Sequence, residues 1–193
     1  MRVAPIGMVP SEDPFAYAVM AARLTHGHPS GYLPAGAYAQ ILSGLLHASR
    51  PSLRAAVSRA NDRLGRERGH EETLRALQQA LALADEPGTP TAERVETLGA
   101  GWTGEEALAI GVYCALVATD FVHGVRLAVN HSGDSDSTGS IAGALLGVQC
   151  GEYGLPGDWL ARLELRDTLS AVADDLLIGY GGGPRWRERY PGT

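Results

Sequence analysis

Hydrophobic residues recur along most of this chain at the three- and four-residue spacing of amphipathic helices. The repeat is clearest where Leu74, Leu77 and Leu81 fall on one face of a predicted helix. Ser, Asp or Pro near a start and Gly or Pro beyond an end delimit several of these segments. The predicted helices cover residues 11–24, 38–48, 51–64, 71–84, 91–98, 105–120, 136–151 and 158–177.

No segment shows the alternation of apolar and polar residues that marks a half-buried strand. We therefore predict an all-α fold, a compact multi-helix bundle of about seven to nine helices. The length of 193 residues and the 45% hydrophobic content suit one domain with one core. We place this domain at residues 1–180, followed by a Gly/Pro/Arg-rich tail at 181–193 whose basic cluster is solvated.

Four glycines recur at every fourth position of the predicted helix at 136–151: Gly139, Gly143, Gly147 and Gly151. On a helix they form a smooth ridge that lets another backbone approach closely. Each interior glycine costs about 1 kcal/mol of helix propensity, which tight packing would have to offset. We therefore expect this helix to be central and fully surrounded.

Charge and hydropathy exclude several classes of protein. A net charge of −6 argues against a protein that coats nucleic acid. The longest apolar run, residues 141–150, is shorter than the ~20 residues of a membrane helix, and no signal segment opens the chain. We expect a cytoplasmic protein that binds neither nucleic acid nor membrane. Cys114 and Cys150 lie in apolar predicted helices and are expected to be buried free thiols.

The most distinctive segment is His-Ser-Gly-Asp-Ser-Asp-Ser-Thr-Gly at 131–139, which opens a helix without further charge until Glu152. It combines the carboxylates of Asp134 and Asp136 with several hydroxyls, and such hard oxygen ligands suit Mg²⁺. A structural cap is the alternative, because Asp and Ser are also favoured at helix starts. An EF-hand loop is excluded, since its twelfth position is Leu145 rather than Glu.

The segment at 131–143 resembles the signature of the ADP-ribosylglycohydrolases, which remove ADP-ribose from modified targets. Its Asp-Ser-Asp-Ser form is closest to the branch that hydrolyses ADP-ribosyl-arginine, which includes the dinitrogenase reductase-activating glycohydrolases. Three further segments resemble the family in the same order along the chain. They are Met-Arg-Val-Ala-Pro-Ile-Gly at 1–7, Leu-Thr-His-Gly-His-Pro at 24–29, and Gly-Trp-Thr-Gly-Glu-Glu-Ala-Leu at 101–108.

The resemblance implies an all-α ADP-ribosylglycohydrolase-like domain with a binuclear Mg²⁺ centre. Asp134, Asp136 and Ser137 match the positions that coordinate these ions, and the two aspartates carry the catalytic role. The implied reaction is hydrolysis of the glycosidic bond between ADP-ribose and a protein side chain, arginine favoured. The metals would position and polarise the distal ribose as that bond breaks.

The resemblance also implies where ADP-ribose or an ADP-ribosylated protein binds. His26 matches a ligand-contacting loop position. Met1 and Arg2 match a segment that lies beside the diphosphate. We therefore expect these three residues to contact the substrate.

One family motif is not found in this sequence. Full-length members carry an earlier Thr-Asp-Asp-Thr-like motif that supplies the other metal ligands. Glu12-Asp13 opens a helix instead, and we expect Asp174-Asp175 to be part of a solvated helix face. The chain thus resembles the C-terminal two-thirds of the family domain, and we expect an N-terminal truncation with weak metal binding and little or no catalysis. A separate chain could supply the front half.

Other candidate residues have a structural alternative. His26 and His28 would suit Zn²⁺ rather than Mg²⁺, but no further His or Cys set accompanies them. Glu105 and Glu106 complement a helix start better than they serve acid–base catalysis. Trp102 and Tyr32 could stack on adenine, although core packing is the expected role of both. His131 is expected to play a capping role.

Two further functions stay open at this point. The first is a catalytically inactive relative that binds ADP-ribose or is a decayed fragment. The second is a purely structural helical domain that resembles the family through its glycine-rich helix alone. This structural alternative predicts no binding of metal or ADP-ribose even when the missing N-terminal part of the family domain is restored.

Overall fold

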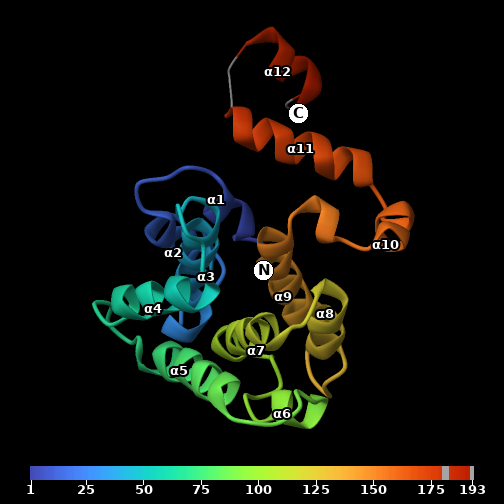
Figure 1. Ribbon diagram of the computed structural model, residues 1–193. Coiled ribbons are helices and arrows are strands. Elements are labelled where there is room, and N and C mark those ends of the chain that lie inside the picture. The colour runs from blue at the N-terminus through green and yellow to red at the C-terminus, as the bar shows by residue number, and fades with distance from the viewer. Residues whose placement is uncertain (180–182, 192–193) are drawn as a thin grey trace. The chain divides into compact units, whose positions relative to one another are not determined.

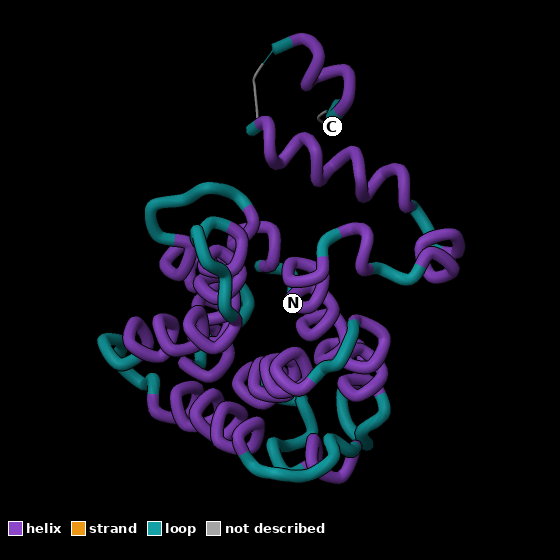
Figure 2. The backbone as a smooth tube through the Cα atoms, in the orientation of Figure 1, coloured by secondary structure: helices purple, strands orange, loops and turns teal. Residues whose placement is uncertain are grey.

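The computed structural model describes residues 1–179 and 183–191. Within these residues the chain consists of helices joined by loops, without a strand (Figure 2), which confirms the predicted all-α class. Twelve α-helices and one 3-10 helix are present in the described part, more than the predicted number. Contacts divide the chain into two compact units, Met1–Pro156 and Gly157–Thr193. The predicted boundary between residues 180 and 181 lies outside the described residues.

The helices of the first unit are coloured from blue to orange-brown in Figure 1. They are α1 (Ala4–Met8), α2 (Pro14–Arg23), α3 (Pro29–Leu46), α4 (Leu53–Leu64), α5 (Glu71–Asp85), α6 (Ala92–Glu96), α7 (Gly104–Val117), α8 (Phe121–Val129) and α9 (Ser135–Cys150), followed by the 3-10 helix η1 (Glu152–Gly154). The second unit contains α10 (Gly157–Arg162), α11 (Arg166–Ile178) and α12 (Pro184–Arg189).

The core of the first unit is built around α3 and α7, which contact each other. Helix α3 also packs against α1, α2 and α4, and α7 also packs against α5, α8 and α9 (Figure 1). All residues of α7 from Ala107 to Ala115 are buried, because this helix is apolar on every side. These two helices hold the elements that carry the candidate site.

The glycine-rich helix α9 is not the surrounded helix that its sequence predicted. Its contacts are mainly with α7 and α8, on one side. A Cβ at Gly139 would meet Val129 closely, but at Gly147 and Gly151 no described atom lies within 4 Å of that position. Close packing of another element against the glycine ridge therefore occurs only at its start, at Gly139.

Local sequence explains most helix starts. Asp13 rather than Ser11 caps α2, where its carboxylate accepts the Ala16 N–H at 2.9 Å. Helix α3 begins earlier than predicted, because the ring of His28 accepts the Ser30 N–H at its start and Pro29 takes its first position. Pro34 lies inside this helix.

The second unit corrects two predictions. The helix expected at 158–177 is interrupted at residues 163–165, where Leu165 has a φ of 57°. The basic cluster at 185–189 lies in α12, where its charged side chains are exposed and Arg189 pairs with Asp175 at 2.7 Å. Asp175 is itself buried and accepts the Tyr190 hydroxyl at 2.8 Å, so only Asp174 belongs to the expected solvated face.

The two cysteines differ. Cys114 lies buried in α7, and this burial raises its pKa to about 12. Cys150, at the end of α9, is exposed, contrary to the expectation of two buried thiols. No helix within the described ranges is both long and apolar enough to cross a membrane.

Candidate active site

A cavity of about 380 Å³ in the first unit brings together five of the six predicted site residues. Met1, Arg2, His26, Asp134 and Ser137 all line it. The sixth, Asp136, is exposed and lies beside this wall in the first turn of α9. The segments that meet here are far apart in the sequence: the start of the chain, the α2–α3 loop, the α6–α7 loop and the start of α9.

Asp134 occupies the N-cap position of α9, but its side chain does not form the capping hydrogen bond. Its carboxylate accepts the Ser137 hydroxyl at 2.8 Å, and that hydroxyl lies 3.4 Å from the carboxylate of Asp136. Interactions with Asp136 and then with the Ser137 hydroxyl lower the pKa of Asp134 below its ordinary value. The lowered pKa means that the Asp134 carboxylate is ionised at neutral pH.

The loop that carries Asp134 is tied to the segment before α7. The Asp134 N–H donates to the Ala100 carbonyl at 2.8 Å. Gly133 lies so close to the same carbonyl that a Cβ would collide with it. Glu96, at the end of α6, accepts the backbone N–H of Ser132 at 3.0 Å and its hydroxyl at 2.6 Å. No local sequence pattern predicts this role of Glu96, because its partner lies 36 residues away.

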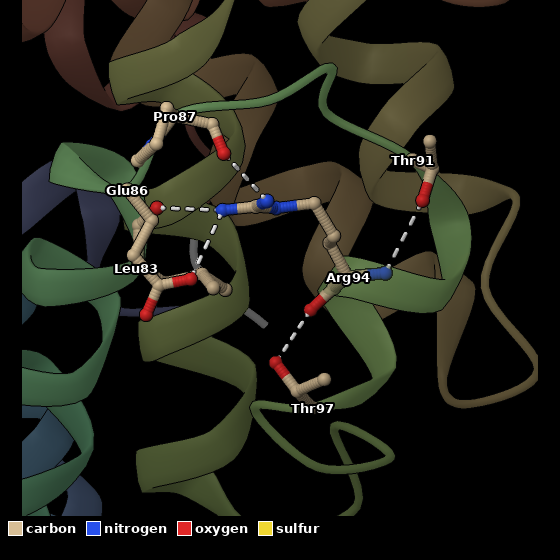
Figure 3. Close-up of polar contacts among 6 residues, drawn as sticks. All are labelled: Leu83, Glu86, Pro87, Thr91, Arg94 and Thr97. Carbon is tan, nitrogen blue, oxygen red and sulfur yellow. Dashed lines mark hydrogen bonds and ion pairs between the residues drawn. The ribbon is translucent and has the colours of Figure 1, made fainter.

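Helix α6 is anchored at its other side by Arg94 (Figure 3). The guanidinium donates to the carbonyls of Leu83 and Pro87, at 3.3 and 3.2 Å, and reaches the Glu86 carboxylate at 3.3 Å. The Thr91 hydroxyl caps the same helix by accepting the Arg94 N–H. Contacts at both ends thus fix the short helix that holds the Ser132 loop.

His131 is a structural residue of this loop, as expected, and it is buried. Its Nδ1 accepts the Gly133 N–H at 3.0 Å, so the proton of the neutral ring lies on Nε2. Nε2 then donates to the Thr138 hydroxyl at 3.0 Å, which in turn donates to the Ala128 carbonyl at 2.7 Å. This chain of hydrogen bonds joins α8 to the start of α9.

The loop before α7 forms the opposite side of Asp134. Gly101 has a φ of 75°, and its N–H donates to the Glu106 carboxylate at 3.1 Å. This contact supports the structural role expected for Glu106. Trp102 follows Gly101 and lines the cavity with its side chain 77% exposed, so the expectation that it packs in the core is wrong. Tyr32 is half-buried, with the Arg23 guanidinium 4.7 Å from its ring centroid.

Arg2 lies on another wall of the cavity. Its guanidinium donates to the Thr25 hydroxyl at 2.7 Å and to the Ala21 carbonyl at 3.1 Å. The Thr25 hydroxyl lies 2.8 Å from Nδ1 of His26. Nδ1 of His28 accepts the Ser30 N–H and so caps α3. The network positions a cationic side chain and an imidazole at the cavity.

The donor set limits which metal this site could hold. Asp134, Asp136 and Ser137 offer only oxygen atoms, which suit a hard cation such as Mg²⁺. No group of three or more His, Cys, Asp or Glu side chains in the described part of the chain is arranged to hold a metal ion. Since Mg²⁺ requires about six ligands, water, substrate or another polypeptide would have to complete the shell.

Comparison with known proteins identifies the family of this chain. The chain matches the ADP-ribosylglycohydrolase family over residues 1–185. It is 30% identical over 184 residues to an uncharacterised protein of Archaeoglobus fulgidus, in an alignment that covers 91% of this chain. The chain spans 56%, or about half, of the length of that relative. With a family match over nearly its whole length, the chain belongs to the ADP-ribosylglycohydrolase family.

Proposed function

We propose that this chain takes part in hydrolysis of the glycosidic bond between ADP-ribose and a protein side chain, with arginine as the favoured acceptor. Family membership supports a glycohydrolase of this kind. The observation that carries the proposal is the shared cavity, which gathers Arg2, His26, Asp134 and Ser137 from distant segments. A cytoplasmic location is part of the same proposal.

The cavity and the motif at 134–137 suit ADP-ribosyl-arginine. Arg2 offers a guanidinium to the diphosphate, which it can bind with several donors. The Asp-Ser-Asp-Ser segment at 134–137 supports arginine as the acceptor, because it resembles the branch of the family that hydrolyses ADP-ribosyl-arginine.

The residues at the start of α9 fit part of an Mg²⁺ centre, and we propose Asp134, Asp136 and Ser137 as its ligands from this chain. Bound Mg²⁺ would supply polarisation and alignment of the distal ribose, with two ions in a complete site. The Ser137 hydroxyl orients the Asp134 carboxylate through their 2.8 Å hydrogen bond. Arg2 and His26 hold the substrate, while the Glu96 and Ala100 contacts keep the carboxylates in place.

A second candidate function is an ADP-ribose-binding protein without catalysis. It is favoured by the finding that no group of three or more His, Cys, Asp or Glu side chains within the described ranges could hold a metal ion. In that case the cavity would still bind ADP-ribose through Arg2 and His26. A separate polypeptide that supplies more carboxylates would convert such a protein into an enzyme.

Release of ADP-ribose from arginine-modified and serine-modified protein, with Mg²⁺ or with EDTA, distinguishes the two candidates. The first proposal predicts release that requires Mg²⁺, is faster from arginine and disappears in Asp134→Ala. The second predicts ADP-ribose binding without release from either substrate. Equal release in Mg²⁺ and EDTA would contradict both.

A further inference from the structure

Trp102 is the residue of the cavity whose environment the proposed function leaves unexplained. Its side chain is 77% exposed, although burial of an indole is worth several times the burial of a methylene group. Exposure alone does not indicate a site, since Tyr153 is also fully exposed on the same unit. Trp102 differs because it lines the cavity that contains Asp134.

The backbone holds Trp102 next to the acidic loop. The Cβ position of the preceding residue, Gly101, lies 3.7 Å from Cβ of Asp134 and 3.6 Å from its carbonyl oxygen. Gly101 is fixed by its hydrogen bond to Glu106, and the Ala100 carbonyl accepts the Asp134 N–H. The loop that carries Trp102 is thus joined to the loop that carries Asp134, and both residues line the same cavity.

An exposed aromatic face that lines a substrate cavity can bind a planar cation. The ring attracts the cation through its quadrupole, and guanidinium stacks on indole better than a compact ammonium does. We propose that Trp102 is a specificity-determining residue that stacks on the guanidinium of the target arginine. This inference rests on the proposed function, which places ADP-ribose in the same cavity. It deepens that function by naming the residue that recognises the acceptor side chain.

The test measures recognition of guanidinium apart from turnover. Calorimetry first determines the affinity of the full chain for ADP-ribose in Mg²⁺. Agmatine, which carries a guanidinium, and N-carbamoylputrescine, its neutral ureido counterpart, are then titrated into the ADP-ribose complex. The proteins are wild type, Trp102→Ala, Trp102→Phe and, as an exposed aromatic control, Tyr153→Ala.

We expect the wild type to prefer agmatine by about 2- to 30-fold, the range of one cation–π contact. Trp102→Ala should lose this preference and keep its ADP-ribose affinity, Trp102→Phe should retain part of it, and Tyr153→Ala should match the wild type. An unchanged preference in Trp102→Ala, or a loss of ADP-ribose affinity alone, overturns the inference and leaves the proposed function standing. A folded wild type that does not bind ADP-ribose overturns both.

Discussion

At the scale of single residues, Asp134 shows how the site departs from an ordinary helix start. The carboxylate of an N-cap aspartate usually accepts a hydrogen bond from an N–H group of the first turn. Here the carboxylate instead faces Ser137 and Asp136 at the wall of a cavity. The start of α9 therefore lacks this stabilising hydrogen bond, and the negative charge of the Asp134 carboxylate is available to a ligand.

The sequence alone predicts Asp134, Asp136 and Ser137 as candidate metal ligands, because hard oxygen donors at this spacing are chemically distinctive. The exposure of Trp102 could not be predicted from the sequence. Hydrophobic patterning assigns a tryptophan to the core unless the surrounding backbone is known, and here Gly101 turns the chain with a positive φ.

The two cysteines provide a prediction at this scale. Burial raises the pKa of Cys114 to about 12, so at pH 8 it stays a neutral thiol, and the thiolate is the reactive form. We expect a thiol reagent such as dithionitrobenzoate to titrate one group, Cys150, in the native protein and two in denaturant. Cys150→Ser should abolish the native reaction. Rapid native reaction of both thiols would contradict the buried position of Cys114.

At the scale of elements, α6 is a short helix that links two loops. Arg94 fixes it to the α5–α6 turn (Figure 3). Glu96 fixes the loop before Asp134. Most helices of this unit followed from their periodicity, but such contacts between distant loops have no local pattern. The sequence did not predict α8 as a separate helix, because only three residues separate it from the end of α7.

Replacement of Glu96 tests this link. Glu96→Ala removes the acceptor of both Ser132 hydrogen bonds, so the Asp134 loop loses one of its anchors. We expect Mg²⁺-dependent affinity for ADP-ribose to fall by about 10-fold, the lower end for a residue that supports metal ligands. Glu96→Gln, which keeps an acceptor oxygen, should restore part of it. Glu93→Ala on the same helix is the control, and an equal loss there would refute a positioning role.

Two glycine replacements test the packing around α9. Gly147→Ala should raise the free energy of unfolding by about 0.5–1 kcal/mol, because an interior helix position gains propensity and no described atom lies within 4 Å of the new Cβ. Gly133→Ala should lower it by about 1–3 kcal/mol, because its Cβ would collide with the Ala100 carbonyl. Urea denaturation measures both. Destabilisation by Gly147→Ala would instead support the predicted surrounded ridge.

At the scale of the whole molecule, the two units are stabilised differently. The hydrophobic core cluster lies entirely within the first unit, from Val3 to Leu146. In the described part of the second unit the buried residue is Asp175, which pairs with Arg189 and accepts the Tyr190 hydroxyl. Several large apolar side chains of α11, including Leu169 and Leu177, are exposed. Polar contacts therefore join α12 to α11.

This difference predicts the effect of removing the buried carboxylate. Asp175→Asn should weaken the contact with Arg189 and Tyr190, because a charge-assisted pair at 2.7 Å is replaced by a neutral acceptor. We expect faster amide hydrogen exchange in α12 than in wild type. Asp174→Asn, an exposed neighbour, should leave the exchange unchanged. Equal exchange in wild type and Asp175→Asn would show that the ion pair does not hold this helix.

The central claim is that the cavity of the first unit binds ADP-ribose together with Mg²⁺ at the start of α9. The most direct test is calorimetric titration of ADP-ribose into the whole chain, with Mg²⁺ or EDTA. The double variant Asp134→Ala/Asp136→Ala is the control. We predict binding in Mg²⁺ that is lost in EDTA and in a folded double variant. Absence of binding to the folded wild type, or equal binding in all cases, would contradict the claim.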